Sequence, residues 1–167
     1  LASYVEPRCG PRYRSSMCGR YVISSSAEVI AEVFGVSLSG VFPSRYNIAP
    51  TQSVPVVQGG ESGRSIVSMR WGLTPGWAKP KLGPRGGVRL PDFINARSET
   101  AAVKPSFRRA WKSGRCLLPA DGFYEWKKQP DGGKQAHYIR MHAPHLFAMA
   151  ALWERWVSPE GEGRDGV

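Results

Sequence analysis

The sequence contains few cysteines and no long apolar run. Its three cysteines, Cys9, Cys18 and Cys116, form an odd set with no C-x-x-C spacing, so neither a disulfide framework nor a zinc knuckle is indicated. No apolar stretch is long enough to span a membrane, and residues 1–16 lack the apolar region of a secretory signal. We therefore expect a protein of a reducing, cytosolic compartment.

Acidic residues are also scarce relative to basic ones. The chain has 13 Asp and Glu against 23 Lys and Arg, a net charge of +10. Such an excess favours a polyanionic partner, for which nucleic acid is the usual example, although it could also serve solubility alone. Six tryptophans are available for base stacking. The histidines His137, His142 and His145 have no metal-ligand spacing, and no metal or other cofactor is expected.

The length of 167 residues suits one domain with a packed core. Short strand patterns alternate with short helical ones, which predicts an α+β fold: a mainly antiparallel sheet or open barrel with short flanking helices. Residues 1–16 are interpreted as a disordered or mis-annotated leader, and residues 17–167 as the domain.

The local patterns predict particular elements. A helix is expected at 25–35, where Ser25 and Glu28 form a capping box and Val29, Ile30, Val33 and Phe34 form the apolar face. A second helical region, 98–114, is broken by Pro105. The segment 79–92 is rich in proline, glycine and basic residues and is expected to be a mobile surface loop, and 158–167 a turn. Strands are expected at 18–23, 53–58, 64–71, 115–128 (with a turn inside) and 136–141, and also at 146–157, which could instead be a helix.

Cys18 directly follows Met17 and is the first candidate for chemistry. If the protein begins at Met17 and loses that methionine, Cys18 carries a free α-amine next to its thiol. An α-amine has a pKa of about 7.7–8.0, so part of it is unprotonated at neutral pH. The amine can form an imine with an aldehyde, and the thiolate can then close a thiazolidine ring. The alternative is a buried structural cysteine in a strand.

The segment 94–100 is polar and follows the apolar residues Phe93 and Ile94. Asn95 can donate and accept hydrogen bonds, and Arg97 can bind a phosphate through two hydrogen bonds. The alternative is a helix start, with Asn95 or Ser98 as the cap and Glu99 near the helix dipole.

Glu125 stands between Tyr124 and Trp126. Shielding by these aromatic rings would raise the pKa of its carboxyl group, as suits a general acid or base. The alternative is a solvent-facing strand residue paired with Lys127 or Lys128.

Two tryptophans lie near turns in the segment 69–78. Either could stack on bases or wedge between them. We expect Trp71 to pack in the core and Trp77 to be exposed. Asp121 is expected to serve the turn before Gly122.

Six ordered motifs, "MCGRY", "NIAPTQ", "MRWGLTPGWA", "INARSET", "RCLLPADGFYEWKK" and "AALWE", together resemble the SOS-response-associated peptidase (SRAP) family. The match runs from Met17 to about Trp156. The resemblance implies recognition of abasic sites in single-stranded DNA, chiefly at junctions with double strands, and a thiazolidine crosslink formed by the N-terminal cysteine. It assigns catalysis to Cys18, Asn95 and Glu125, and DNA contacts to Arg20, Asn47, Pro50, Trp77 and Arg97.

The resemblance also implies a monomer in the bacterial cytoplasm, associated with the nucleoid and not with a membrane. The chain departs from the family pattern in two places. Cys18 is internal, so its chemistry requires a start at Met17 or removal of the leader, for which the family's peptidase label offers self-cleavage. A later family histidine is absent before Val167, so we expect a C-terminal truncation. Two alternatives stay open: a non-covalent single-stranded DNA-binding module, and a class II glutamine amidotransferase with an N-terminal cysteine nucleophile.

Overall fold

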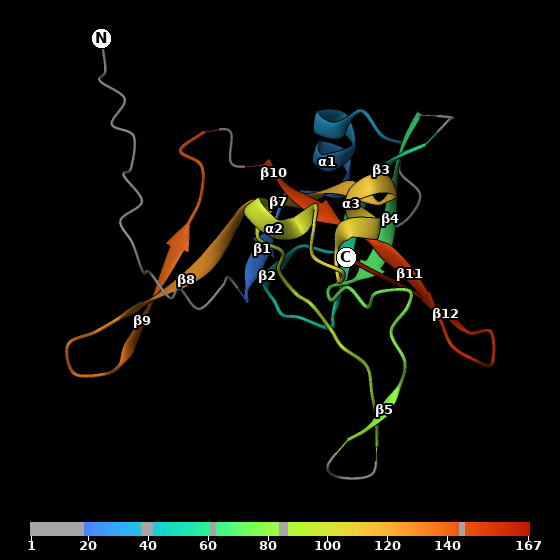
Figure 1. The fold of residues 1–167 in the computed structure, drawn as a ribbon. Coiled ribbons are helices and arrows are strands. Elements are labelled where there is room, and N and C mark those ends of the chain that lie inside the picture. Colours follow the sequence, from blue (N-terminus) through green and yellow to red (C-terminus); the bar gives the residue numbers. More distant parts are fainter. Residues whose placement is uncertain (1–18, 38–41, 61–62, 84–86, 144–145) are drawn as a thin grey trace.

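The structure of the chain is a computed structural model, and it describes residues 19–37, 42–60, 63–83, 87–143 and 146–167 (Figure 1). Cys18, the first candidate for chemistry, therefore lies outside the described residues. In chain order, the helices and strands are β1 (Tyr21–Ile23), α1 (Ala27–Phe34), β2 (Arg45–Ile48), β3 (Ser53–Gly60), β4 (Gly63–Arg70), β5 (Lys81–Leu82), β6 (Val88–Arg89), α2 (Ser98–Ala101), α3 (Arg108–Ser113), β7 (Arg115–Ala120), β8 (Gly122–Lys128), β9 (Lys134–Ile139), β10 (Phe147–Leu152), β11 (Glu154–Val157) and β12 (Gly163–Gly166).

The strands form two larger sheets and one small ribbon. One sheet has four strands in the order β2-β1-β8-β9, the other has six in the order β10-β7-β3-β4-β12-β11, and β5 pairs with β6 alone. Only the contact of β12 with β4 is parallel among the described strand pairs. The two larger sheets form an open half-barrel, and the predicted α+β class is confirmed.

One core lies between the two larger sheets. Tyr21 and Ile48 enter it from the four-stranded sheet, and Val56, Ile66 and Leu118 from the six-stranded one. Four consecutive residues of β3, 54–57, are buried. Because successive side chains of a strand point to opposite faces, both faces of β3 are covered there. A smaller cluster beside α2 and α3 contains Leu73, Ala101, Phe107 and Ala110.

Helix α1 differs in detail from its prediction. The N-cap is Ser26, whose hydroxyl accepts from the Val29 N–H at 3.4 Å, and not Ser25. Ile30 and Phe34 are buried, but Val29 and Val33 are 42% and 58% exposed. With only eight residues, the helix buries one i, i+4 stripe and leaves its flanks in solvent.

The C-terminal half shows two further differences. Segment 79–92 is not structureless, because it contains the β5–β6 ribbon, and 158–167 contains strand β12. Segment 146–157 forms strands β10 and β11 and no helix. The other expected strands and the two helical segments on either side of Pro105 are confirmed.

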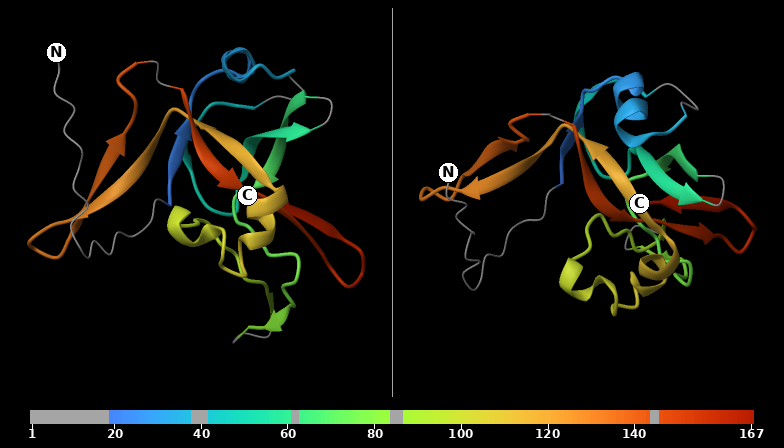
Figure 2. Two further views of the ribbon diagram at one scale, coloured as in Figure 1. Left: turned by 45° about the horizontal axis from the view of Figure 1, so that its top comes forward. Right: turned by 90° about the horizontal axis from the view of Figure 1, so that it is seen from above.

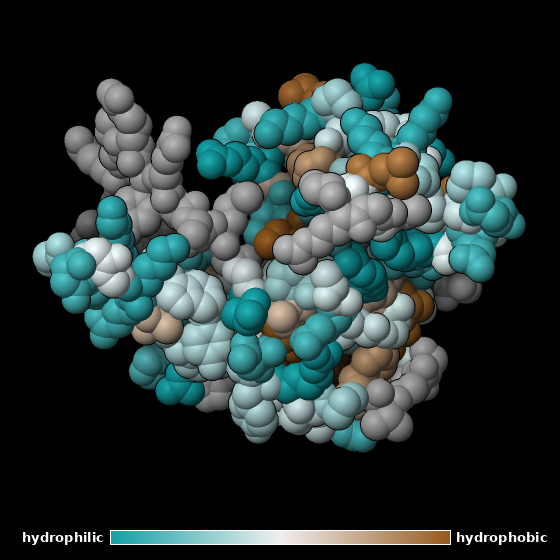
Figure 3. Space-filling view, turned by 90° about the horizontal axis from the view of Figure 1, so that it is seen from below, coloured by the Kyte–Doolittle hydropathy of each residue, from teal (hydrophilic) through white to brown (hydrophobic). Residues whose placement is uncertain are grey.

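Three hairpins extend from the half-barrel. The β8–β9 and β11–β12 hairpins point to opposite sides, and the β5–β6 ribbon projects at a third position (Figures 1 and 2). The face seen from the side of that ribbon is largely hydrophilic, with apolar residues in small separate patches (Figure 3). Within the described ranges, no helix combines the length and apolar character needed to span a membrane.

Candidate functional site

Strand β1 organises the candidate site, because it brings the start of the described chain beside β8. Tyr21 pairs with Phe123 in an antiparallel register, and the Tyr124 N–H donates to the Arg20 carbonyl at 2.9 Å. Continuing this register by two residues sets Glu125 beside Gly19, which is bonded to Cys18.

Glu125 is half-buried on β8 and lies directly opposite His137 of β9 in the strand register. Its two aromatic neighbours lie on the other face of the strand, where the rings of Tyr124 and Trp126 are 6.5 Å apart between centroids. Strand alternation therefore gives no support to the shielding of Glu125 by these rings, which stays a prediction. Among the described residues, neither Lys127 nor Lys128 forms an ion pair with Glu125.

Asn95, from a different part of the chain, lies at a cavity that Tyr21 of β1 also lines. It is half-buried and lines a cavity of about 160 Å³ together with Tyr21, Trp71 and Phe107. The loop before it is fixed by a hydrogen bond from Trp71 Nε1 to the Ile94 carbonyl at 3.0 Å. The site thus combines a carboxylate on β8, the strand that pairs with β1, with an amide in a cavity that Tyr21 also lines.

Tyr21 links these two parts of the site and was not identified from the sequence. Its side chain is fully buried, and its hydroxyl has no hydrogen-bond partner in the described part of the chain. Its ring packs edge-on against Trp71 with centroids 5.4 Å apart, and burial raises the pKa of the phenol. The available signal was a tyrosine inside the otherwise apolar run "YVI".

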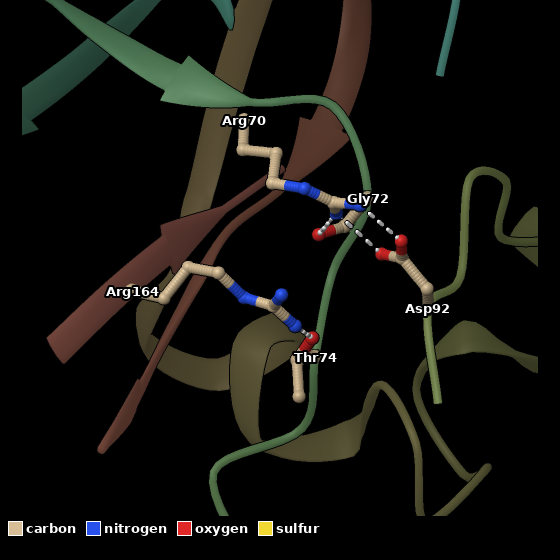
Figure 4. Close-up of polar contacts among 5 residues, drawn as sticks. All are labelled: Arg70, Gly72, Thr74, Asp92 and Arg164. Atoms are coloured by element: carbon tan, nitrogen blue, oxygen red, sulfur yellow. Dashed lines mark hydrogen bonds and ion pairs between the residues drawn. The ribbon is translucent and has the colours of Figure 1, made fainter. Parts of the chain in front are cut away.

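An ion pair supports the loop that carries Asn95. Arg70, at the end of β4, donates from Nη1 and Nη2 to Oδ1 and Oδ2 of Asp92 at 2.8 and 2.6 Å (Figure 4). Gly72 lies against this pair with a φ of +138°, and a Cβ there would collide with the Asp92 carboxylate. Residues Leu73 and Phe93 continue the connection through reciprocal N–H to carbonyl bonds of 2.9 Å.

The loop that carries Trp77 is held from three sides. The Gly76 N–H donates to Glu154 Oε1 at 2.9 Å, and Trp156 Nε1 donates to the Ala78 carbonyl at 2.8 Å. The Arg164 guanidinium bonds the Thr74 hydroxyl (Figure 4). Trp77 itself is 58% exposed, as predicted, so a fixed loop presents a large aromatic ring to solvent.

The other predicted DNA-contacting residues divide between these regions. Arg20 is half-buried at the start of β1, and Asn47 is exposed on the neighbouring strand β2. Pro50 is half-buried in the turn after β2, and Arg97 is exposed immediately before α2. Arg20 therefore lies just before β1, the strand next to β8, Asn47 lies one strand further away on β2, and Arg97 follows Asn95 along the chain.

The alternative interpretation of segment 94–100 as a helix start is partly right. Helix α2 begins at Ser98, with Glu99 in its first turn. Its N-cap is Arg97, without a side-chain capping bond, so neither Asn95 nor Ser98 is the cap.

Asp121 has a larger structural role than the predicted turn. Its buried carboxylate accepts from the N–H groups of Ser24 and Ser25 at 2.6 and 2.8 Å and from the Ser25 hydroxyl at 2.6 Å. These bonds join the β7–β8 corner to the end of β1. Asp121 thus helps to hold β1 against β8, the strand that carries Glu125.

Sequence comparison connects this arrangement to characterised proteins. The chain is 40% identical over 149 residues to "Abasic site processing protein YoqW" of Bacillus subtilis, covering 87% of this chain and 63% of that protein. It is 32% identical over 156 residues to "Abasic site processing protein YedK" of Escherichia coli, covering 87% and 65%. The chain thus spans less than two-thirds of the length of these relatives.

Solved structures share the fold. A protein from Bordetella bronchiseptica superposes with a TM-score of 0.71 at 25% identity, covering 89% of this chain and 69% of that one. A protein from Bacteroides thetaiotaomicron gives a TM-score of 0.73 at 22% identity, covering 89% and 66%. The family model described as SOS response associated peptidase (SRAP) matches residues 17–166. The chain therefore belongs to the SRAP family.

Proposed function

We propose that this protein, in a form that begins with Cys18, recognises abasic sites in single-stranded DNA and binds them covalently as a thiazolidine. The observation that carries this proposal is the register of β1 with β8, which extends through the bond from the Tyr124 N–H to the Arg20 carbonyl. Continued by one more residue, this register would set Glu125 beside Gly19, one peptide bond from Cys18. The relatives named as abasic site processing proteins support the choice of substrate.

The chemistry would begin at the ring-opened abasic sugar, which carries an aldehyde at C1′. The unprotonated α-amine of Cys18 adds to C1′ to give a carbinolamine. The Cys18 thiol gives its proton to the Glu125 carboxylate, which passes it to the carbinolamine hydroxyl, and the hydroxyl leaves as water to yield an iminium ion. The thiolate then adds to C1′ to close the ring. One water is released overall, and Glu125 ends in its initial state.

The remaining residues would position the reactants. Asn95, fixed by the Ile94 anchor, would hold the amine and the sugar through its amide. Arg20 and Arg97 would contact phosphates, and Asn47 the extruded nucleotide, while Pro50 and Trp77 would line the bend in the strand. Any route to a terminal Cys18 satisfies the mechanism, including self-cleavage of the leader.

A denaturing gel tests this proposal. The chain begun at Met17, its Cys18→Ala variant and the full 167-residue chain are mixed with a single-stranded oligonucleotide that has one abasic site, or with its undamaged counterpart. We expect a heat-stable slow band only with the Met17 chain and the abasic strand, and with the full chain only if its leader is removed. No band, with reversible binding of both strands, would contradict the covalent function and favour a DNA-binding module. Glutaminase activity without DNA binding would favour the amidotransferase alternative.

A further inference from the structure

A groove beside the β5–β6 ribbon extends from Trp77 to cations that the proposed lesion chemistry does not use. It has a volume of about 960 Å³ and is lined by Trp77, Lys79, Lys81, Leu82, Arg89 and Asp92, among others. Asp92 is already paired with Arg70, so the charge that the groove offers to a ligand is positive.

The strand register places two of these cations against each other. Lys81 of β5 is the direct cross-strand partner of Arg89 of β6, and like charges in this position destabilise a sheet. Both residues are exposed, and no described carboxylate forms an ion pair with either. The ribbon thus holds two positive charges together, an arrangement that a bound anion would stabilise.

The wall of the groove is aromatic. Trp77 Nε1 donates to the Pro105 carbonyl at 3.2 Å, which fixes one edge of the indole and leaves the rest of the ring exposed. The anchors of its loop at Gly76 and Ala78 hold the ring in place. Leu82 on β5 is 82% exposed and adds apolar surface to the same wall.

An exposed indole next to paired cations matches the chemistry of an unpaired nucleotide. Proteins bind single strands by stacking bases on aromatic rings and by tracking the phosphates with cationic side chains. Asp92 at the groove and Asn95 in the candidate site are three residues apart in the sequence. A strand that leaves the lesion site could therefore continue into the groove.

We propose that this groove is a subsite for one undamaged nucleotide of the single strand beside the lesion. Its base stacks on Trp77, and its phosphate lies between Lys81 and Arg89. The position of this nucleotide relative to the lesion rests on the proposed function above, whereas its binding to the groove does not require Cys18.

The test measures equilibrium binding of undamaged single-stranded DNA. Fluorescence anisotropy of a labelled 15-nucleotide oligothymidylate is recorded over a range of NaCl concentrations. The proteins are the unaltered chain, a K81Q/R89Q double variant and a matched R64Q/R115Q variant. The salt slope is the slope of the logarithm of the binding constant against the logarithm of the NaCl concentration. Arg64 and Arg115 lie together at a different hollow, over β3 and β7, so both variants lose the same charge. Circular dichroism confirms that each variant is folded.

K81Q/R89Q is expected to reduce the magnitude of the salt slope by about 0.7 to 1.4, the contribution of one or two phosphate contacts on a single strand. R64Q/R115Q should leave the slope unchanged. Trp77→Ala should weaken binding by roughly 5- to 100-fold, the range that base stacking contributes, without changing the slope, and Trp77→Phe should restore part of the affinity.

Equal salt slopes for the two charge variants would overturn the subsite. So would a loss of affinity of K81Q/R89Q for a 15-base-pair blunt duplex that equals its loss of affinity for the single strand. Covalent capture of abasic DNA is scored separately with the same proteins. If a crosslink forms while the salt slopes of the two variants stay equal, the nucleotide subsite is rejected and the covalent function is retained. A slope change without any crosslink rejects the covalent function and leaves the groove as a site for single-stranded DNA.

Discussion

The guanidinium group of Arg70 donates to both carboxylate oxygens of Asp92, at 2.8 and 2.6 Å, and so ties the end of β4 to the loop before Asn95. The two side chains are 23% and 27% exposed, so water screens the pair and its contribution to global stability is small. Its two-point geometry nevertheless fixes the direction of the loop, which a single contact would not do.

Arg70→Lys should therefore affect the site more than the fold. Lysine keeps the charge but loses the planar fork, and we expect a loss of about 1 kcal/mol or less in unfolding free energy. The rate of covalent capture should fall several-fold, because Asn95 becomes less well placed. Chemical denaturation and a time course of crosslinking give the two quantities. A crosslinking rate that falls only in proportion to the unfolding free energy would indicate that the Arg70–Asp92 ion pair has a structural role alone.

Gly72→Ala should destabilise the protein. Gly72 has a φ of +138°, and its Cβ position is filled by the Asp92 carboxylate, so the substitution combines backbone strain with a steric clash. We expect a loss of about 1–3 kcal/mol in unfolding free energy. Gly59→Ala is the matched control, since Gly59 has no neighbour within 4 Å of a Cβ. Equal stability of the two variants would contradict the assigned packing.

Glu154→Ala should loosen the loop that presents Trp77. The buried carboxylate accepts from the Gly76 N–H at 2.9 Å, and its removal leaves that donor unpaired at a cost of about 1–3 kcal/mol. Affinity for oligothymidylate should fall as well, because the indole is no longer held. Glu154→Gln keeps an acceptor oxygen and should retain most of both properties. If Glu154→Ala binds DNA normally, the anchor does not position Trp77.

The buried thiol of Cys116 should make the unfolding free energy depend on pH in the alkaline range. Burial raises the pKa of its thiol from about 9.0 to about 12. Between these values the unfolded chain ionises Cys116 and the folded chain does not, so its contribution is fully present below pH 9.0 and is lost as the pH rises toward 12. Cys116→Val should therefore show a shallower decline in unfolding free energy from pH 8.5 to 10.5. Identical slopes for the two proteins would contradict a buried, protonated thiol.

The sequence was most informative where local pattern decides the structure. Short apolar segments on either side of a glycine-rich turn, with Val54, Val56 and Ile66 among their residues, predicted β3 and β4. The glycine and proline residues around Trp77 indicated an exposed ring in a turn. Such features depend on neighbours in the chain, and local sequence specifies them.

The β5–β6 ribbon was missed because its composition is that of a loop. Its strands are two residues each, too short for any periodicity, and the Gly83 N–H to Gly87 carbonyl bond that helps to close the ribbon involves backbone alone. That Lys81 and Arg89 are cross-strand partners is known only from the register of β5 with β6.

The assembly of the candidate site depends on contacts between distant parts of the chain. Ser25 and Asp121 are 96 residues apart and Arg70 and Asp92 are 22 apart, and no local pattern specifies such pairs. The association of Asn95 and Glu125 with one site came from the family resemblance, and the sequence pattern alone left both with structural alternatives. The structure brings each of them to β1, and their catalytic roles stay predictions.

The chemical state of Cys18 in the crosslinked species tests the central claim most directly. The chain begun at Met17 is reacted with abasic single-stranded DNA, denatured and treated with iodoacetamide, and its peptides are identified by mass spectrometry. A thiazolidine consumes both the amine and the thiol, so Cys18 should carry the sugar remnant and resist alkylation, while Cys116 in the same sample is alkylated and serves as the internal control. A crosslinked species in which Cys18 is alkylated, or in which the DNA is attached to another residue, would contradict the account.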